Sequence, residues 1–234
     1  MTKIGFSTGA LALGDFRKAL DLTQGKPVSA VELSALRVQE LPSLVTALPK
    51  LDLTQFSYIA VHAPSFFSAD EEDSIVAQLM QVPSQYPIVL HPDTIHDFTK
   101  WARFGTQLLL ENMDRRKTDG RTVKELSVWF NRLPNSRLCF DLAHVQQFDP
   151  TMTEAFQILA QFGNRICQVH ISELDSASHH FPLSYSSLQA FSEVTCNIPR
   201  NAAFIIESRI RPDEMESEFE KVCSLIAALD PIPA

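Results

Sequence analysis

The stretch "RLCFDLAHVQQFD", from Arg137 to Asp149, decides the fold. It opens with a short, continuous apolar run, which is the pattern expected of a strand that is covered on both faces. The run ends in Asp141, and His144 follows three residues later. A carboxylate and an imidazole at the end of a buried strand need a chemical reason. That reason depends on whether other strands end in the same way.

Seven further runs have the same character, and most of them start about 30 residues apart, which is the length of one βα unit. An open doubly wound sheet is the alternative, but "GFSTGALALG" lacks the dinucleotide and phosphate-loop spacings. Eight units predict a single (β/α)8 TIM barrel, one domain over residues 1–234. The other runs are KIGFS from Lys3, SAVEL from Ser29, SYIAVH from Ser57, PIVLH from Pro87, QLLLE from Gln107, ICQVH from Ile166 and AFIIE from Ala203.

Helix starts lie between these runs. "TVKEL" from Thr122 and "TMTEAF" from Thr151 both match a capping box, in which Thr and a Glu three residues later satisfy free amides of the first turn. An acidic cluster from Asp70 and Pro212 mark two more starts. The longest connector, "SELDSASHHFPLSYSS" from Ser172, is predicted to lie at the functional rim and to form a lid.

The composition limits the partners of the protein. A formal net charge of −8 opposes binding to a phosphate backbone, so nucleic acid is an unlikely partner. No apolar run approaches the ~18 residues of a membrane span. The N-terminal segment has no secretory pattern, and a cytoplasmic location is expected. Barrels of this kind often pair through their helices, so a homodimer is also an expectation, although no apolar stripe marks an interface.

The first polar residue at the end of each of strands three to eight is His, Asp or Glu. In a parallel barrel these ends face one rim, where active sites are built. Such groups would repel one another or stay unpaired without a cation, so the pattern predicts a divalent metal centre and explains why Asp141 ends its strand. Mixed imidazole and carboxylate ligands suit Zn, Mn, Fe or Co, with Mg if histidine is a minor ligand. The six residues are His62, His91, Glu111, Asp141, His170 and Glu207.

The order of these residues resembles the xylose-isomerase-like TIM-barrel superfamily, which includes sugar isomerases, epimerases and endonuclease IV enzymes. The resemblance spans essentially the whole chain and lies in the ordered set, not in one string. It implies that Glu111, Asp141, His170 and Glu207 are the four metal ligands. It also implies that His144 is the histidine of a D-x-x-H segment, which faces substrate in the epimerases and holds another zinc in the endonucleases.

The leading interpretation is a metal-dependent isomerase or epimerase of a small sugar or sugar derivative. In the members that this chain resembles, the metal is a Lewis acid for a carbonyl and its neighbouring hydroxyl, and two glutamates move protons on either side of an enediolate. Here those glutamates would be Glu111 and Glu207. The chemistry needs a base beside an acidified C–H and a cation for the developing oxyanion, and carboxylates that share a metal meet both needs.

The alternative is a multi-metal phosphoesterase similar to endonuclease IV. In those enzymes histidines on strands three and four hold a second zinc that shares the strand-five glutamate. His62, His91 and Glu111 fit that arrangement. Histidines on these strands also line the sugar pocket of epimerase-like members, so they leave the choice open. A barrel that binds metal and a metabolite without turnover is the third interpretation.

The loop after strand seven departs from the endonuclease pattern. A third zinc there uses an Asp-x-His pair, but Ala177 and Ser178 stand two residues before His179 and His180. "HHFPL" instead looks like the H-x-P segment of many epimerase-like members. His179 and His180 therefore stay candidates for a further metal or for substrate contact.

Two further residues carry an expectation. Arg209 follows the last strand and is a candidate for binding a phosphate or carboxylate of the substrate, because its guanidinium presents a planar fork to such groups. Glu32 is predicted to be buried at the end of strand two and paired with a cation, with substrate contact as the alternative.

Overall fold

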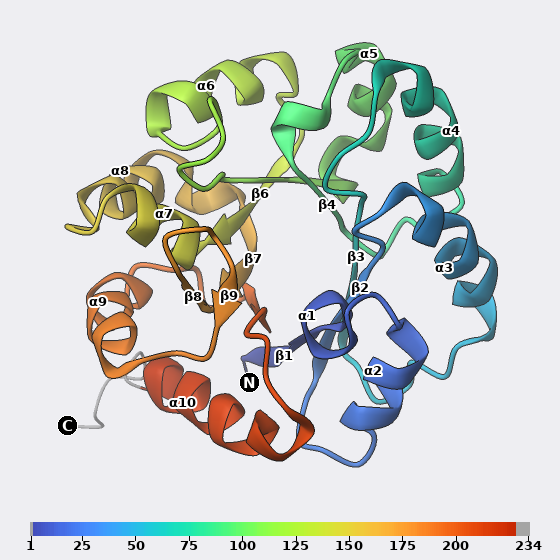
Figure 1. The fold of residues 1–234 in the computed structure, drawn as a ribbon. Coiled ribbons are helices and arrows are strands. Elements are labelled where there is room, and N and C mark those ends of the chain that lie inside the picture. The colour runs from blue at the N-terminus through green and yellow to red at the C-terminus, as the bar shows by residue number, and fades with distance from the viewer. Residues whose placement is uncertain (1, 228–234) are drawn as a thin grey trace.

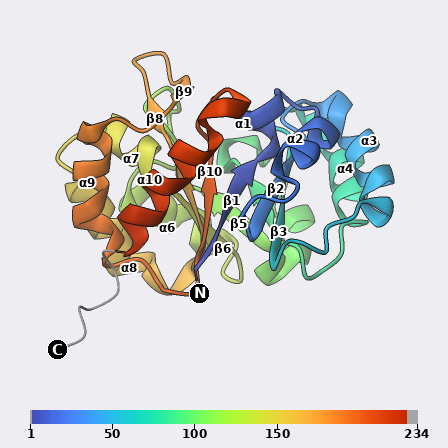
Figure 2. The ribbon, with the colours of Figure 1, turned by 90° about the horizontal axis from the view of Figure 1, so that it is seen from below.

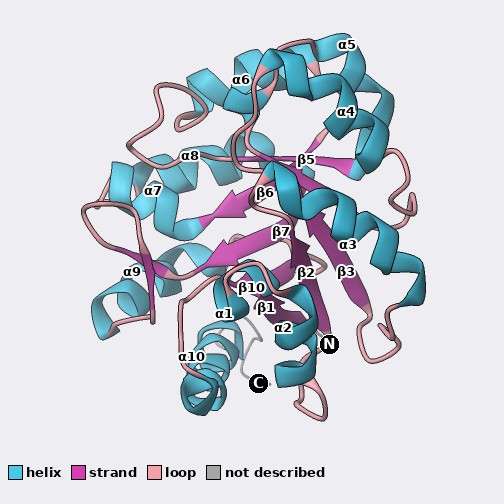
Figure 3. Cartoon of the chain, turned by 45° about the vertical axis from the view of Figure 1, so that its right-hand side comes forward, coloured by secondary structure: helices cyan, strands magenta, loops and turns pink. Residues whose placement is uncertain are grey.

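The computed structural model describes residues 2–227 of the 234-residue chain, and these form a closed barrel of eight parallel strands surrounded by helices (Figure 1). Around the barrel the order is β1-β10-β7-β6-β5-β4-β3-β2, which is the order along the chain. The predicted (β/α)8 fold is confirmed. The strands, drawn as arrows in Figure 3, are β1 (Lys3–Ser7), β2 (Ala30–Ser34), β3 (Tyr58–His62), β4 (Ile88–Leu90), β5 (Leu108–Glu111), β6 (Arg137–Asp141), β7 (Ile166–Ile171) and β10 (Ala203–Ile206).

Helices follow the strands and form the outer ring. Several short connections are 3-10 turns rather than α-helix. No helix within residues 2–227 combines the length and the apolar character that crossing a membrane requires. The α-helices are α1 (Thr8–Ala12), α2 (Phe16–Thr23), α3 (Leu41–Ala47), α4 (Ala69–Leu79), α5 (Phe98–Trp101), α6 (Val123–Arg132), α7 (Leu142–Phe148), α8 (Thr153–Phe162), α9 (Tyr185–Thr195) and α10 (Met215–Ala227); the 3-10 helices are η1 (Val38–Glu40), η2 (Leu48–Lys50), η3 (Pro92–Thr94), η4 (Ala102–Gln107), η5 (Gly163–Arg165) and η6 (Pro212–Glu214).

The two predicted capping boxes have different outcomes. Thr122 caps α6 as expected, because its side chain accepts a hydrogen bond from the Glu125 amide at 3.2 Å. The prediction for Thr151 is wrong, since α8 begins at Thr153 and the Asp149 carboxylate accepts from the Glu154 amide at 2.8 Å. A carboxylate is a stronger acceptor than a hydroxyl, and Asp149 lies within reach of the same turn.

The interior of the barrel changes character along its axis. The main core lies between strands and helices, and a small separate cluster of Val89, Leu109 and Cys139 packs inside the barrel. Side chains two apart on a strand share a face, so Glu111 points inward one layer beyond Leu109, and Asp141 one layer beyond Cys139. The barrel is therefore apolar deep inside and polar toward the carboxyl ends of its strands.

The predicted lid contains a short hairpin. Its strands β8 (Glu173–Leu174) and β9 (His180–Phe181) pair in the antiparallel sense. Figure 2 shows this hairpin and α1 at the end of the barrel opposite to the N-terminal end of β1. The loop thus lies on the side of the barrel at which the parallel strands end.

Candidate metal centre

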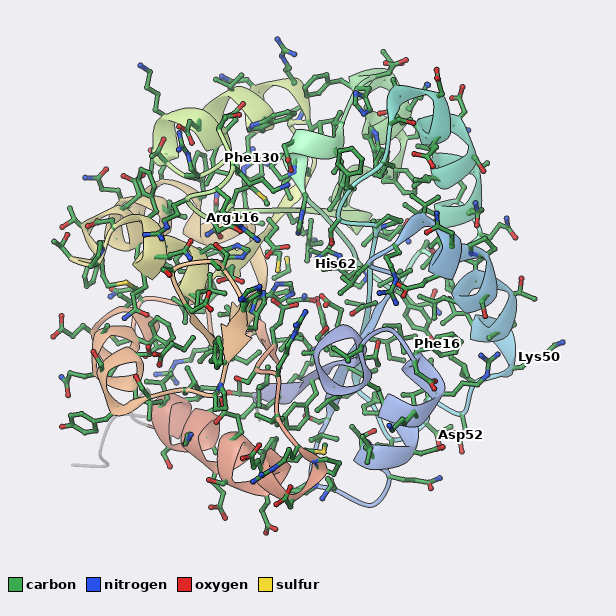
Figure 4. All side chains as sticks on the ribbon, viewed as in Figure 1. Phe16, Lys50, Asp52, His62, Arg116 and Phe130 are labelled. Atoms are coloured by element: carbon green, nitrogen blue, oxygen red, sulfur yellow. The ribbon has the colours of Figure 1, made fainter. Side chains whose placement is uncertain are left out.

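The structure brings the six strand-end residues to one place inside the barrel. His62 ends β3, Glu111 ends β5 and Asp141 ends β6, whereas His91 and Glu207 directly follow β4 and β10. The parallel register aligns these ends, and Asp141 of β6 lies opposite His170 of β7. Figure 4 shows His62 near the middle of the ring of helices, with Arg116 also inside the ring, while Lys50 and Asp52 lie at its periphery.

Two groups of ligand atoms have the spacing of a metal site, and they share Glu111. In each group, one ligand atom per residue lies within 4.8 Å of all the others. The larger group contains all four ligands that the resemblance implies. The groups are His62, His91 and Glu111, and Glu111, Asp141, His170 and Glu207.

Glu111 divides its two oxygens between these groups. Its Oε2 lies 3.2 Å from Nε2 of His62 and 3.3 Å from Nε2 of His91. Its Oε1 lies 3.2 Å from Nδ1 of His170 and 3.4 Å from Nδ1 of His144. Glu111 would therefore supply one oxygen to each ligand group.

Hydrogen bonds behind the histidines select the nitrogen that faces the centre. Nδ1 of His62 lies 2.7 Å from the Ala63 carbonyl oxygen, which leaves Nε2 for the centre. Nε2 of His170 lies 2.8 Å from Oε2 of Glu32, which leaves Nδ1. A ligating histidine usually gives its second N–H to such an acceptor, because this fixes the tautomer and the ring orientation.

One buried oxygen of the larger group is left without a donor in the described part of the chain. Oδ1 of Asp141 accepts from the His144 amide at 2.7 Å, whereas Oδ2 of Asp141 has no hydrogen-bond partner. A buried carboxylate oxygen without a donor is costly. The donor set of carboxylates and imidazoles around it is suited to a divalent ion at that position.

The charges in the centre also favour a cation. Burial raises the pKa of the Glu207 carboxyl to about 8, and the charges of Glu32 and Glu111 contribute, against the attraction of His170. Burial likewise raises the pKa of Asp141. Burial alone would raise the pKa of Glu111, but the charge and hydrogen bond of His170 outweigh it and hold that pKa well below its usual range. A divalent ion bound among these carboxyls would favour their ionised forms and lower their pKa values.

The remaining predicted histidines lie around this centre. His144 is buried and its Nδ1 lies 2.8 Å from the Asn112 carbonyl oxygen. The ring of His180 is 6.1 Å from that of His144, and its Nδ1 lies 3.9 Å from Oε2 of Glu207. His179 belongs to neither ligand group; it lies on the outer wall of the pocket, exposed, with Nδ1 3.1 Å from Oδ2 of Asp175.

A cavity of about 500 Å³ opens onto the ligands. Arg209, the predicted substrate-binding residue, lines it and is exposed. Arg116 and Lys117 also line it, and the sequence-based predictions missed them. Their signal was the basic run directly after the strand-five glutamate in "ENMDRRK". Arg116 Nη2 lies 2.6 Å from Asp114 Oδ2, and Lys117 Nζ lies 2.6 Å from Asp93 Oδ2.

The same run fastens the loop after β7 to the rim. Nη2 of Arg115 donates to the Ser176 carbonyl at 2.5 Å, and Nη1 of Arg116 donates to the Ala177 carbonyl at 3.3 Å. Gln147 adds hydrogen bonds to the Asp175 carbonyl and to Ser178. These contacts hold the predicted lid against the pocket, which Ser178, His179 and His180 help to line.

Comparison with solved structures finds the same fold in proteins of low sequence identity. Endonuclease IV from Thermus thermophilus is 17% identical over 97% of this chain and 98% of its own, with a TM-score of 0.59. A xylose isomerase domain protein from Alicyclobacillus acidocaldarius is 12% identical over 98% and 99%, with a TM-score of 0.63. A xylose isomerase-like TIM barrel protein from Mycobacterium smegmatis in complex with magnesium is 13% identical over 98% and 97%, with a TM-score of 0.58.

Comparison at the level of sequence finds a matching family model but no curated protein. No curated protein matches the chain significantly. The family model described as "Xylose isomerase-like TIM barrel" matches residues 98–211, the segment that contains every ligand of the larger group, from Glu111 to Glu207. Eight parallel strands close into a barrel, so the chain has the fold that this family model describes.

Proposed function

We propose that this chain hydrolyses a phosphate ester of a small molecule at a pair of divalent cations that share Glu111. The observation that supports the proposal is the division of the Glu111 carboxylate, with Oε2 toward His62 and His91 and Oε1 toward His170. The order of the strand-end residues in the sequence, taken without the structure, favours an isomerase. The second ligand group favours the hydrolase, because an isomerase of this design needs only the larger group.

The residues of the chain have separate parts in this proposal. When bound, paired divalent ions polarise phosphoryl oxygens and ionise water near neutral pH. His62 and His91 would hold one ion with Glu111, and the other members of the larger group would hold the second. Arg209 is the cation best placed to pair with substrate oxygens, because it forms no ion pair within residues 2–227 whereas Arg116 and Lys117 are already paired.

The size of the pocket and the charge of the chain favour a small substrate. A cavity of about 500 Å³ falls within the range of small-molecule sites, roughly 300–1,000 Å³. The net charge of −8 opposes the Lys and Arg contacts on which nucleic-acid binding depends. A phosphorylated metabolite, and not a duplex, is the proposed substrate.

Sugar isomerisation or epimerisation is the second candidate, and one observation favours it. Oε1 of Glu111 and Oε2 of Glu207 lie 3.2 and 3.3 Å from Nδ1 of His170. Burial raises the pKa of Glu207 to about 8, whereas the pKa of Glu111 is held low. Two carboxyls beside one imidazole, in surroundings that separate their pKa values in the metal-free site, suit a pair of groups that exchange protons with a substrate.

The number of ions per chain tests the proposal. We expect two ions in the wild-type protein, one in a variant with both His62→Ala and His91→Ala, and two in the control His96→Ala, whose exposed side chain belongs to neither ligand group and does not line the cavity. Elemental analysis measures this number. A panel of sugar phosphates and aryl phosphates should be hydrolysed by the wild type and the control but not by the double variant.

Other results would contradict the hydrolase. A single ion in the wild type, with deuterium from solvent incorporated into a ketose or aldose by wild type and double variant alike, would support the isomerase instead. Two ions with no turnover on either panel would support a barrel that binds metal and metabolite without catalysis.

A further inference from the structure

A buried polar network lies directly beneath the larger ligand group. Its centre is Glu32 on β2, which meets His170 of β7 although β1 and β10 separate those strands in the barrel. Glu32, His170 and Gln168 each have no measurable exposure. Glu32 and Gln168 meet His170 across the inside of the barrel, on the side of its ring that faces away from the other ligands.

Glu32 contacts Nε2 of His170, the ring nitrogen that faces away from the centre, and also contacts Gln168. Oε2 of Glu32 lies 2.8 Å from Nε2 of His170 and accepts from Nε2 of Gln168 at 2.6 Å. Oε1 of Gln168 in turn accepts from the Tyr58 hydroxyl at 2.9 Å. The amide of Gln168 is thereby held at both ends, and it holds the Glu32 carboxylate in place.

His170 is the side chain that can compensate the buried charge of Glu32. Within residues 2–227 Glu32 has no Lys or Arg partner, and an isolated buried carboxylate is strongly unfavourable. Its one titratable contact is His170. The predicted pairing with a cation is met by this imidazole and not by a permanently charged side chain.

The three histidines of the ligand groups differ in what lies behind them. His62 has the Ala63 carbonyl oxygen behind Nδ1, and Nδ1 of His91 has no hydrogen-bond partner in the described chain. Behind Nε2 of His170 lie Oε2 of Glu32 at 2.8 Å and the side-chain nitrogen of Gln168 at 2.7 Å, and of these two only the carboxylate oxygen can accept a proton from an imidazole N–H. A carboxylate acceptor makes an imidazole a stronger ligand than a carbonyl does, because it stabilises positive charge on the ring.

We propose that Glu32 is a positioning residue that makes the two metal sites unequal: it strengthens His170, so that the larger group binds the first ion tightly and the group of His62, His91 and Glu111 binds a second, exchangeable ion. The proposal rests on the metal sites of the proposed function but not on the reaction. The larger group also has four ligands against three, and His91 is partly open to the pocket.

Cobalt titration of the metal-free protein tests this inference. Wild-type protein should bind Co²⁺ in two steps, read from its visible absorption, with a tight and a weak class. Glu32→Gln keeps the shape and a hydrogen-bonding oxygen but loses the charge. It should weaken the tight class roughly 10–100-fold, the usual effect of removing such a partner, and leave the weak class within about 3-fold of the wild type.

The control is Glu72→Gln, which changes another buried glutamate outside both ligand groups. Its carboxylate accepts hydrogen bonds from the His96 and Asp97 amides and from Trp101, so the variant should lose stability and keep both cobalt affinities. If Glu32→Gln does not fold, Glu32→Asp takes its place, because it keeps the charge but is one methylene too short for the 2.8 Å contact with His170. It should weaken the tight class by an intermediate amount.

Two failures can be told apart. If wild-type protein shows no tight cobalt class, the metal sites themselves are refuted. If wild type shows it and Glu32→Gln binds the first ion with unchanged affinity, the role of Glu32 is refuted while the proposed function stands. Equal loss of affinity in Glu32→Gln and Glu72→Gln would also refute it, because general destabilisation would then explain the effect.

Discussion

At the scale of single residues, the side chains of the centre serve two purposes at once. Asp141 ends β6 and also caps α7, because its Oδ1 accepts from the His144 amide while Oδ2 faces the other ligands. This double use answers why a buried strand ends in a carboxylate. The local role and the role in the centre belong to different oxygens, so a substitution can separate them.

The substitution Asp141→Asn should separate the helix-capping role of this residue from its role in the centre. Asparagine is as good a helix N-cap as aspartate, so the cap survives, whereas the anionic ligand is lost. Burial raises the pKa of Asp141, which means that its charge destabilises the metal-free protein at neutral pH. We expect metal-free Asp141→Asn to be as stable as the wild type or more stable by about 1 kcal/mol, a shift of the usual size for a tuned site.

Denaturant unfolding in the presence of a chelator measures that difference, and added Zn²⁺ should stabilise the same variant less than it stabilises the wild type. A loss of several kcal/mol in the metal-free protein would show that Asp141 is needed for folding and not for the centre.

At the scale of elements, local sequence patterns predict the strands of the barrel but not the contacts that join one element to the next. Continuous apolar runs identify all eight strands, and capping residues identify the start of α6. The sequence pattern misplaces the start of α8, because the Glu154 amide donates to the Asp149 carboxylate at 2.8 Å and the Thr151 hydroxyl itself donates to that carboxylate at 2.6 Å. The structure also contains a joint without any sequence signal, in which Glu72 of α4 fastens the segment before α5.

This joint makes an acid-dependent contribution to stability. Oε1 of Glu72 accepts from the amides of His96 and Asp97 and from Trp101, and Lys100 lies 3.3 Å from Oε2. Burial opposes the charge of Glu72, but these hydrogen bonds outweigh it and lower its pKa from 4.5. A lowered pKa means that the stabilisation is fully present above pH 4.5 and is lost as the pH falls through the folded-state value.

Glu72→Gln should therefore cost about 1–3 kcal/mol at pH 7, because charge-assisted hydrogen bonds become neutral ones and one partner is left poorly matched. The gap between variant and wild type should narrow below pH 4.5, the ordinary pKa of the carboxyl. Urea unfolding at a series of pH values measures both. A gap that stays constant or widens toward low pH would refute the assigned role.

At the scale of the whole molecule, the sequence predicts which residues gather but not how they are paired. Parallel strands in a closed barrel bring all their ends to one rim, so six ligand candidates could be found at the strand ends. The contact between Glu32 and His170 crosses the barrel over 138 positions of sequence, and no local pattern contains it. The clamp of Arg115 and Arg116 on the loop after β7 depends likewise on two loops that only the closed barrel brings together.

The division between an apolar outer core and a polar centre predicts how the protein responds to loss of metal. The main core packs strands against helices around the barrel, with residues such as Phe6, Trp101 and Phe204 fully enclosed, and none of them belongs to a ligand group. Ligands that bind only the folded state add stability by mass action, about 2.7 kcal/mol at 100 times the dissociation constant. Chelation should thus lower the melting temperature without unfolding the protein at about 25 °C. Far-ultraviolet circular dichroism and a thermal melt with and without chelator measure this, and loss of the helical signal at room temperature would mean that the centre, and not the outer core, holds the barrel closed.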